Sequence, residues 1–95
     1  MKYICREGIV LTKIAGEWLL IPTRKASEIC PHIMHLALPC AMMWQCLEKG
    51  RSIEDVYKVF SVLTKKDSIE VQKLVDGLIS ELLEKNYLIE VDTKG

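Results

Sequence analysis

The apolar residues of this 95-residue chain change their spacing at Pro39, and this change constrains the fold more than any other feature. Before Pro39 they gather in short runs of β-branched and large side chains, a pattern typical of strands. After Pro39 they recur at intervals of three and four residues, which places them on one face of a helix. Strands followed by helices predict an α+β fold with a segregated sheet.

The first two strands are predicted at residues 9–14 and 17–21. They flank Ala15 and Gly16, a pair that suits a tight hairpin turn. Pro22 ends the second run, because proline has no N–H to donate to a strand ladder. We therefore expect an antiparallel hairpin here.

A third apolar run covers residues 33–38, between Pro31 and Pro39. Two flanking prolines limit it to a short strand at the edge of a sheet. Residues 23–27 are polar and charged, and we expect a loop there. The prediction is a three-stranded antiparallel sheet followed by three helices.

The first predicted helix follows Pro39, which is well tolerated at the start of a helix. Its apolar positions between residues 40 and 47 share one face, and Gly50 suits its end. Ser52 is a favourable N-cap for a second helix, whose apolar positions fall within residues 53–63.

The third predicted helix is the longest. Asp67 and Glu70 form a capping-box pair, and apolar residues follow at helical spacing over residues 71–82. Asn86 suits the left-handed position after a helix, so residues 87–89 are expected to fold back as an apolar tail.

The composition fits one folded domain over residues 1–95, with 49% hydrophobic and 27% charged residues. No apolar run approaches the roughly 20 residues of a membrane span, and the start of the chain lacks the features of an export signal. The four cysteines include no CxxC pair and show no scaffold-like spacing. We expect reduced thiols and a cytoplasmic protein.

Thirteen basic and thirteen acidic residues give a formal net charge of zero. This balance argues against general nucleic-acid binding, which needs a basic excess to displace counterions. The charges are unevenly distributed, because residues 1–25 carry +3 and residues 68–95 carry −3. An apolar groove with walls of different charge would suit one oriented peptide.

No catalytic arrangement or cofactor motif is recognisable, so we expect a protein that is not an enzyme and needs no cofactor. Cys30, His32, His35 and Cys40 are potential zinc ligands within eleven residues. Their spacing departs from compact zinc motifs, and an extended strand sends residue 35 to the face opposite residues 30 and 32. We expect no metal site.

The second and third helices resemble a helix-turn-helix pair, so a winged-helix DNA-binding transcription regulator is an alternative function. Residues 68–86 carry a local charge of −2, which opposes contact with phosphates. A peptide partner is favoured instead, because the unpaired edge of the third strand can accept a visiting strand. Self-pairing of these edges would give a weak homodimer; otherwise the chain is a monomer.

Nearly the whole chain resembles the PqqD-like family. The resemblance rests on five segments: Glu7-Gly-Ile-Val-Leu-Thr, Gly16-Glu-Trp-Leu-Leu-Ile-Pro, Trp44-Gln-Cys-Leu-Glu-Lys-Gly50, Arg51-Ser-Ile-Glu-Asp-Val56 and Leu78-Ile-Ser-Glu-Leu-Leu-Glu-Lys-Asn-Tyr-Leu-Ile89. It implies a RiPP recognition element, a winged-helix-like peptide chaperone. Such modules bind the leader of a ribosomally made precursor peptide and present it to a modifying enzyme in natural product biosynthesis, often of the radical S-adenosylmethionine class.

In that family the leader adds to the third strand and lies against the third helix. The resemblance implies a peptide-binding site made of Ile33, Met34, His35, Leu36, Val71, Lys73, Leu74, Val75 and Leu78. Lys73 would pair with an acidic leader residue. The chain departs from the family at Ala37-Leu38-Pro39-Cys40, where an Asn-Glu-Thr-like turn is usual, and at Leu74, where an acidic residue is common. Both departures make the expected groove more apolar.

Overall fold

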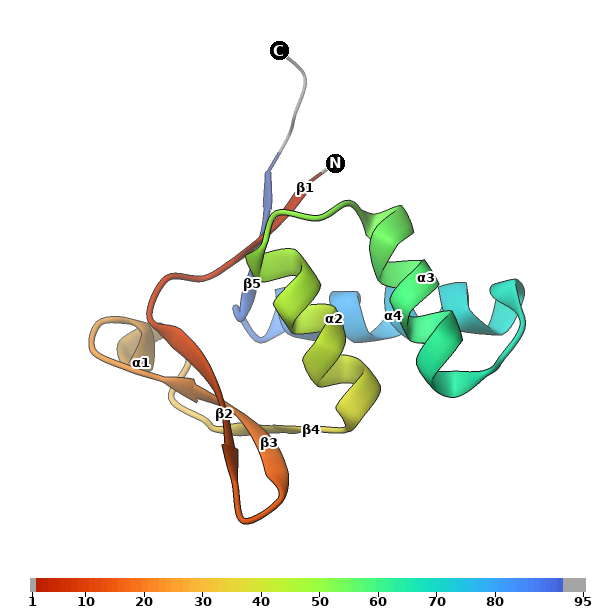
Figure 1. Ribbon diagram of the computed structural model, residues 1–95. Coiled ribbons are helices and arrows are strands. Elements are labelled where there is room, and N and C mark those ends of the chain that lie inside the picture. Colours follow the sequence, from red (N-terminus) through yellow and green to blue (C-terminus); the bar gives the residue numbers. More distant parts are fainter. Residues whose placement is uncertain (1, 92–95) are drawn as a thin grey trace.

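Figure 1 shows the computed structural model of the chain, which describes residues 2–91. Asp92 and Lys94, which belong to the acidic end of the sequence, lie outside these residues. The elements in chain order are β1 (Lys2–Cys5), β2 (Ile9–Ile14), β3 (Glu17–Pro22), α1 (Ala26–Ile29), β4 (Met34–Leu36), α2 (Leu38–Glu48), α3 (Ile53–Thr64), α4 (Ser68–Glu84) and β5 (Leu88–Val91).

The predicted α+β class and the three-stranded antiparallel sheet are confirmed. The strand order is β2-β3-β4, with both pairs antiparallel. The hairpin turn lies where expected, because Ala15 and Gly16 have φ angles of 51° and 81° and Ile14 pairs with Glu17. Positive φ at both central residues is the backbone that matches the twist of a two-residue hairpin.

The third strand is shorter than predicted. It covers Met34–Leu36, whereas the apolar run extends through Leu38. Ala37 is already the N-cap of α2, and its carbonyl accepts the Ala41 N–H at 3.0 Å. The helix therefore begins before Pro39, which occupies a position in the first turn where no N–H is needed.

The predicted starts of the two following helices are confirmed by their caps. The Ser52 hydroxyl accepts the Asp55 N–H at 3.2 Å, and an Asp67 carboxylate oxygen accepts the Glu70 N–H at 2.9 Å. Asn86 has a φ of 69°, the left-handed backbone expected after α4. These ends follow from short-range hydrogen bonds that the sequence encodes locally.

The prediction of a loop over residues 23–27 was wrong in part, because a fourth helix, α1, begins at Ala26. Its approach to β2 depends on Gly8, which has a φ of 91°; a Cβ there would lie 3.0 Å from the Ala26 Cβ and 3.1 Å from the Thr23 carbonyl oxygen. The Thr23 N–H and hydroxyl both donate to the Gly8 carbonyl, at 2.8 and 2.6 Å.

The two ends of the described chain form a second, two-stranded sheet. β1 pairs antiparallel with β5, from Lys2 opposite Val91 to Cys5 opposite Leu88. The sequence predicted an apolar tail after Asn86 but no strand at residues 2–5. In Figure 1 this ribbon extends from the end of α2 that leads to α3, and β1 contacts α2 while β5 contacts α4.

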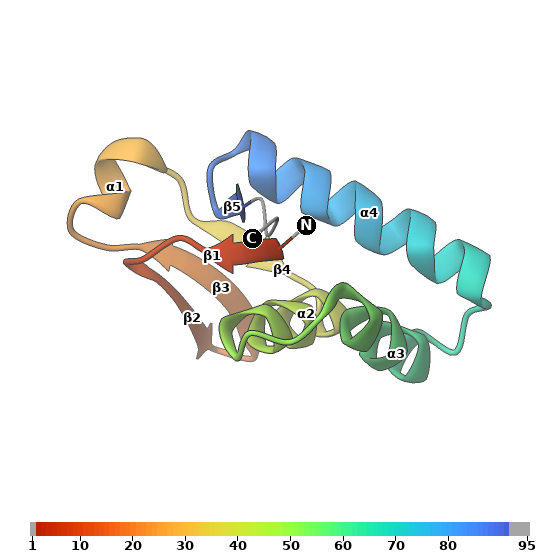
Figure 2. The ribbon, with the colours of Figure 1, turned by 90° about the horizontal axis from the view of Figure 1, so that it is seen from above.

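The hydrophobic core lies where the sheet meets α2, α3 and α4. Figure 2 shows α4 on one side and α2 with α3 on the other. Trp44, Leu20, Val56 and Val75 are completely buried at this junction. Within residues 2–91, no helix combines the length and apolar character needed to cross a membrane.

Candidate functional site

β4 offers an unpaired backbone edge. It pairs with β3 through Met34 opposite Leu20 and Leu36 opposite Trp18. No other strand among residues 2–91 pairs with its second edge. The backbone N–H and C=O groups on such an edge can accept an additional strand.

A hollow of about 460 Å³ lies between this segment and the C-terminal end of α4, and we call it the β4–α4 groove. One wall is the segment that leads into and through β4, and the other comes from the last turn of α4 and the residues after it. The groove is lined by Cys30, Pro31, His32, Ile33, Met34, His35, Glu81, Lys85 and Tyr87.

Two side chains tie these walls together. The buried Cys30 thiol donates to the Asn86 and Lys85 carbonyls, at 3.0 and 3.3 Å. The buried Tyr87 hydroxyl donates to the His32 carbonyl. Burial raises the pKa of the Cys30 thiol, although the positive charge of Arg6 opposes this effect. Cys30 therefore stays protonated at neutral pH and keeps its donor.

The α4 wall carries an ion pair between two of its own residues, Glu81 and Lys85. The Lys85 ammonium donates to a Glu81 carboxylate oxygen at 2.8 Å, and this hydrogen bond raises the pKa of Lys85. Both side chains are about half exposed, so a bound peptide could compete for either charge. The site therefore offers one acidic and one basic group beside the strand edge.

His35 connects this groove to a second hollow at the other end of β4. That hollow has a volume of about 360 Å³ and is also lined by Glu17, Trp18 and Leu38. The His35 Nδ1 lies 3.8 Å from a Glu17 carboxylate oxygen, and both side chains are largely exposed. Hollows at both ends of the strand suit a ligand longer than β4 itself.

The structure brings three of the four predicted β4-side residues into the groove. Ile33, Met34 and His35 line it, and Ile33 is 55% exposed. Leu36 is buried in the hydrophobic core and lines the second hollow. The β4 side of the predicted site is therefore mostly present at the surface.

The predicted residues on α4 are dispersed. Val71 and Val75 are at most 1% exposed and pack in the core, while Leu78 is half-buried against it. Lys73 and Leu74 are exposed but do not line the β4–α4 groove. The α4 wall lies nearer the C-terminus than predicted.

Six residues that line the groove were not predicted: Cys30, Pro31, His32, Glu81, Lys85 and Tyr87. Glu81 and Lys85 continue, at helical spacing, the helix face that carries Leu74 and Leu78, so this extension was a usable signal. Cys30 and Tyr87 had no such signal, because their partners lie 55 or 56 residues away in sequence.

The four potential zinc ligands do not form a metal site. Among residues 2–91, no group of three or more histidine, cysteine or acidic side chains is arranged to hold a metal ion. Cys30 is buried and hydrogen-bonded to backbone, Cys40 lies in α2, and His32 and His35 are exposed.

What the groove can do chemically follows from these parts. An extended chain could pair with the β4 edge through backbone hydrogen bonds and place side chains against Ile33, Met34 and the α4 wall. No family model, curated protein or solved structure matches this chain.

Proposed function

We propose that the chain is a non-catalytic peptide chaperone of the PqqD-like, RiPP recognition element type, working in the cytoplasm. Its sheet and α2 to α4 would correspond to the winged-helix-like module of that family. It would bind the leader of a ribosomally made precursor peptide and present it to a modifying enzyme, for which a radical S-adenosylmethionine enzyme is the leading candidate.

The observation that carries this proposal is the free edge of β4 beside the β4–α4 groove. A free edge alone would invite unspecific pairing. Here the edge is short and adjoins apolar side chains and a charged pair, so both a main-chain contact and a selective contact are possible. We expect the leader to use the main-chain contact for affinity and the side-chain contacts for selectivity.

Binding requires more than the strand edge, because β4 is only three residues long. A disordered leader also loses conformational entropy when it becomes ordered. Apolar leader side chains held against Ile33 and Met34 would offset that cost. We expect a Kd near or below about 1 µM, which corresponds to roughly −8 kcal/mol.

The proposal predicts a short reading frame for a precursor peptide near this gene, and calorimetric titration with the synthetic leader of that peptide tests binding. Ile33→Asp places a charge in the groove and should weaken binding at least about tenfold. Ile14→Asp is the matched control, because Ile14 is 52% exposed at the β2–β3 turn, close to the 55% of Ile33. The control should bind like the parent chain.

Equal leader affinity of Ile33→Asp and the parent would contradict the site. Absence of binding to any leader, combined with a shifted duplex in a low-salt gel assay, would instead favour DNA regulation. We expect no duplex shift, because α4 carries four acidic residues and one basic residue.

A further inference from the structure

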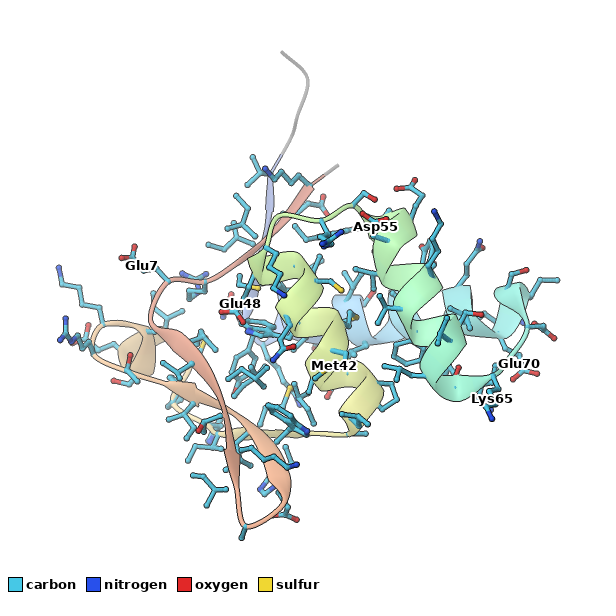
Figure 3. The ribbon with its side chains drawn as sticks, viewed as in Figure 1. Glu7, Met42, Glu48, Asp55, Lys65 and Glu70 are labelled. Atoms are coloured by element: carbon cyan, nitrogen blue, oxygen red, sulfur yellow. The ribbon has the colours of Figure 1, made fainter. Side chains whose placement is uncertain are left out.

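A third hollow lies between α2 and α3, with a volume of about 400 Å³, and we call it the α2–α3 groove. Its floor is apolar, made of Met42, Cys46, Val59 and Leu63, and the exposed Val62 lines its α3 side. Val62 is 75% exposed and Leu63 is 40% exposed, which is unusual for apolar side chains placed side by side on a small domain. Figure 3 shows Met42 on α2, beside the α3 ribbon that runs from near Asp55 toward Lys65.

The rim of the α2–α3 groove is basic. Lys49, Arg51 and Lys58 line it, and all three are exposed. Within residues 2–91, none of these three cations lies within 4.0 Å of a carboxylate oxygen. A chain with zero net charge therefore presents a local cluster of unpaired positive charge around an apolar floor.

α3 forms a ridge at this surface. Lys58 and Val62 line the α2–α3 groove. They also line a different hollow, between α3 and α4, to which Tyr57 and Gln72 contribute. A ridge between two hollows is the shape that a packing helix engages, because side-chain ridges on one helix fit grooves on another.

We propose that the α2–α3 groove docks an amphipathic helix of a partner protein, with apolar anchors at helical spacing flanked by aspartate or glutamate. The apolar anchors would cover Val62 and Leu63. The flanking carboxylates would pair with Lys49, Arg51 and Lys58, and Arg51 can hold a carboxylate with two parallel hydrogen bonds.

The identity of the partner as the modifying enzyme rests on the proposed function, whereas the chemistry of the groove does not. The linings of the α2–α3 and β4–α4 grooves share no residue. A leader and a helix could therefore be bound at the same time, which presentation of a leader to an enzyme requires.

Charge selects this occupant over the alternatives. A symmetric dimer formed through this groove would bring the same basic rim against itself, and like charges at an interface oppose association. Nucleic acid would place phosphates over an apolar floor that offers them no hydrogen bonds. An anionic membrane would accept the charges, but a concave floor suits inserted side chains better than a flat lipid surface.

The test uses a synthetic peptide of about four helical turns, with leucines at i, i+3, i+4 and i+7 and glutamates at the flanking positions. The control peptide keeps the leucines and replaces every glutamate with lysine. In fluorescence anisotropy, the acidic peptide should bind at least about tenfold more tightly than the basic peptide, with an advantage that shrinks as salt rises. Backbone amide shifts should concentrate on α2 and α3.

Variants separate this site from the rest of the surface. Val62→Asp and Lys58→Glu should each weaken the acidic peptide at least about fivefold. Val10→Asp is the matched control for Val62→Asp, since Val10 is an exposed valine on β2. Leader affinity should be unchanged in Val62→Asp, so failure of this inference and failure of the proposed function give different results.

Three outcomes would overturn the inference: equal binding of both peptides, amide shifts centred outside α2 and α3, or retained acidic-peptide affinity in Val62→Asp. Light scattering that shows a dimer lost in Val62→Asp would assign the groove to a second copy instead. Binding to phosphatidylserine vesicles without binding to the acidic peptide would assign it to membranes. If the parent chain binds the acidic peptide in the α2–α3 groove but binds no leader, only the proposed function is refuted.

Discussion

The Tyr87 hydroxyl donates a hydrogen bond to the backbone carbonyl of His32, so a residue after α4 holds the segment that leads into β4. The same two segments are joined by the Cys30 thiol and the Asn86 carbonyl, 3.0 Å apart. These two contacts position the edge of β4 next to the C-terminal end of α4. The width of the β4–α4 groove therefore depends on a few hydrogen bonds between its walls.

Removal of the Tyr87 hydroxyl should loosen the groove. Tyr87→Phe keeps the buried ring and loses the donor, so we expect the free energy of unfolding to fall by about 0.5–1.5 kcal/mol. Leader affinity should fall severalfold because the walls are no longer held together. Urea denaturation and calorimetry measure the two effects.

Tyr3→Phe is the control for this variant, because no described hydrogen bond uses the Tyr3 hydroxyl and its ring is only partly buried. It should match the parent in both assays. If Tyr87→Phe also matches the parent in leader affinity, the bond to His32 does not shape the site.

The link between α3 and α4 should weaken at alkaline pH. The Tyr57 hydroxyl donates to an Asp76 carboxylate oxygen at 2.7 Å. This bond, followed by burial and nearby negative charge, raises the pKa of Tyr57 from 10.0 to about 12. The folded chain holds the phenol proton more tightly than the unfolded chain, so the stability from this bond is complete below pH 10 and is lost as the pH rises through about 12.

Urea denaturation of the parent and of Tyr57→Phe checks this dependence. Below pH 10 the variant should be less stable by about 0.5–1.5 kcal/mol, since it lacks the hydrogen bond. The difference should shrink between pH 10 and 12, because in this range Tyr57 ionises in the unfolded parent while it stays protonated in the folded parent. A difference that stays constant over this range would show that the phenol proton does not support the fold.

The Trp44 side chain should tolerate loss of its polar atom better than loss of its volume. Trp44 is completely buried, and its indole N–H has no hydrogen-bond partner among the described residues. Trp44→Ala should cost about 3–5 kcal/mol through the cavity it leaves. Trp44→Phe should cost clearly less, because it fills part of that cavity and removes an unpaired buried donor.

Thermal and urea unfolding of the two variants provide the comparison, with Leu47→Ala as a reference for an ordinary core truncation in the same helix. We expect about 2–5 kcal/mol for that reference. Equal costs for Trp44→Phe and Trp44→Ala would mean that the indole N–H makes a stabilising contact.

Features that depend on neighbouring residues were predictable from the sequence. The Ala15-Gly16 turn and the Ser52 and Asp67 caps are set by hydrogen bonds or backbone preferences within four residues. The free edge of the third strand was also predictable, because Pro31 and Pro39 limit the length of the run.

Features that depend on distant segments were not predictable. β1 has four residues and pairs only with β5 at the other end of the chain, so no local pattern identifies it. The family resemblance placed the α4 wall at residues 71–78, whereas the β4–α4 groove is lined by Glu81 and Lys85. Core periodicity identifies Val71 and Val75 as one face of the helix but cannot show which turn β4 approaches.

Backbone amide hydrogen exchange at β4, with and without the leader, tests strand addition most directly. Without the leader, amides of Met34–Leu36 that face away from β3 have no strand partner and should exchange quickly. At saturating leader these amides should slow at least about tenfold, while those of the β2–β3 turn stay unchanged. Binding of the leader without any slowing at β4 would contradict strand addition at this edge.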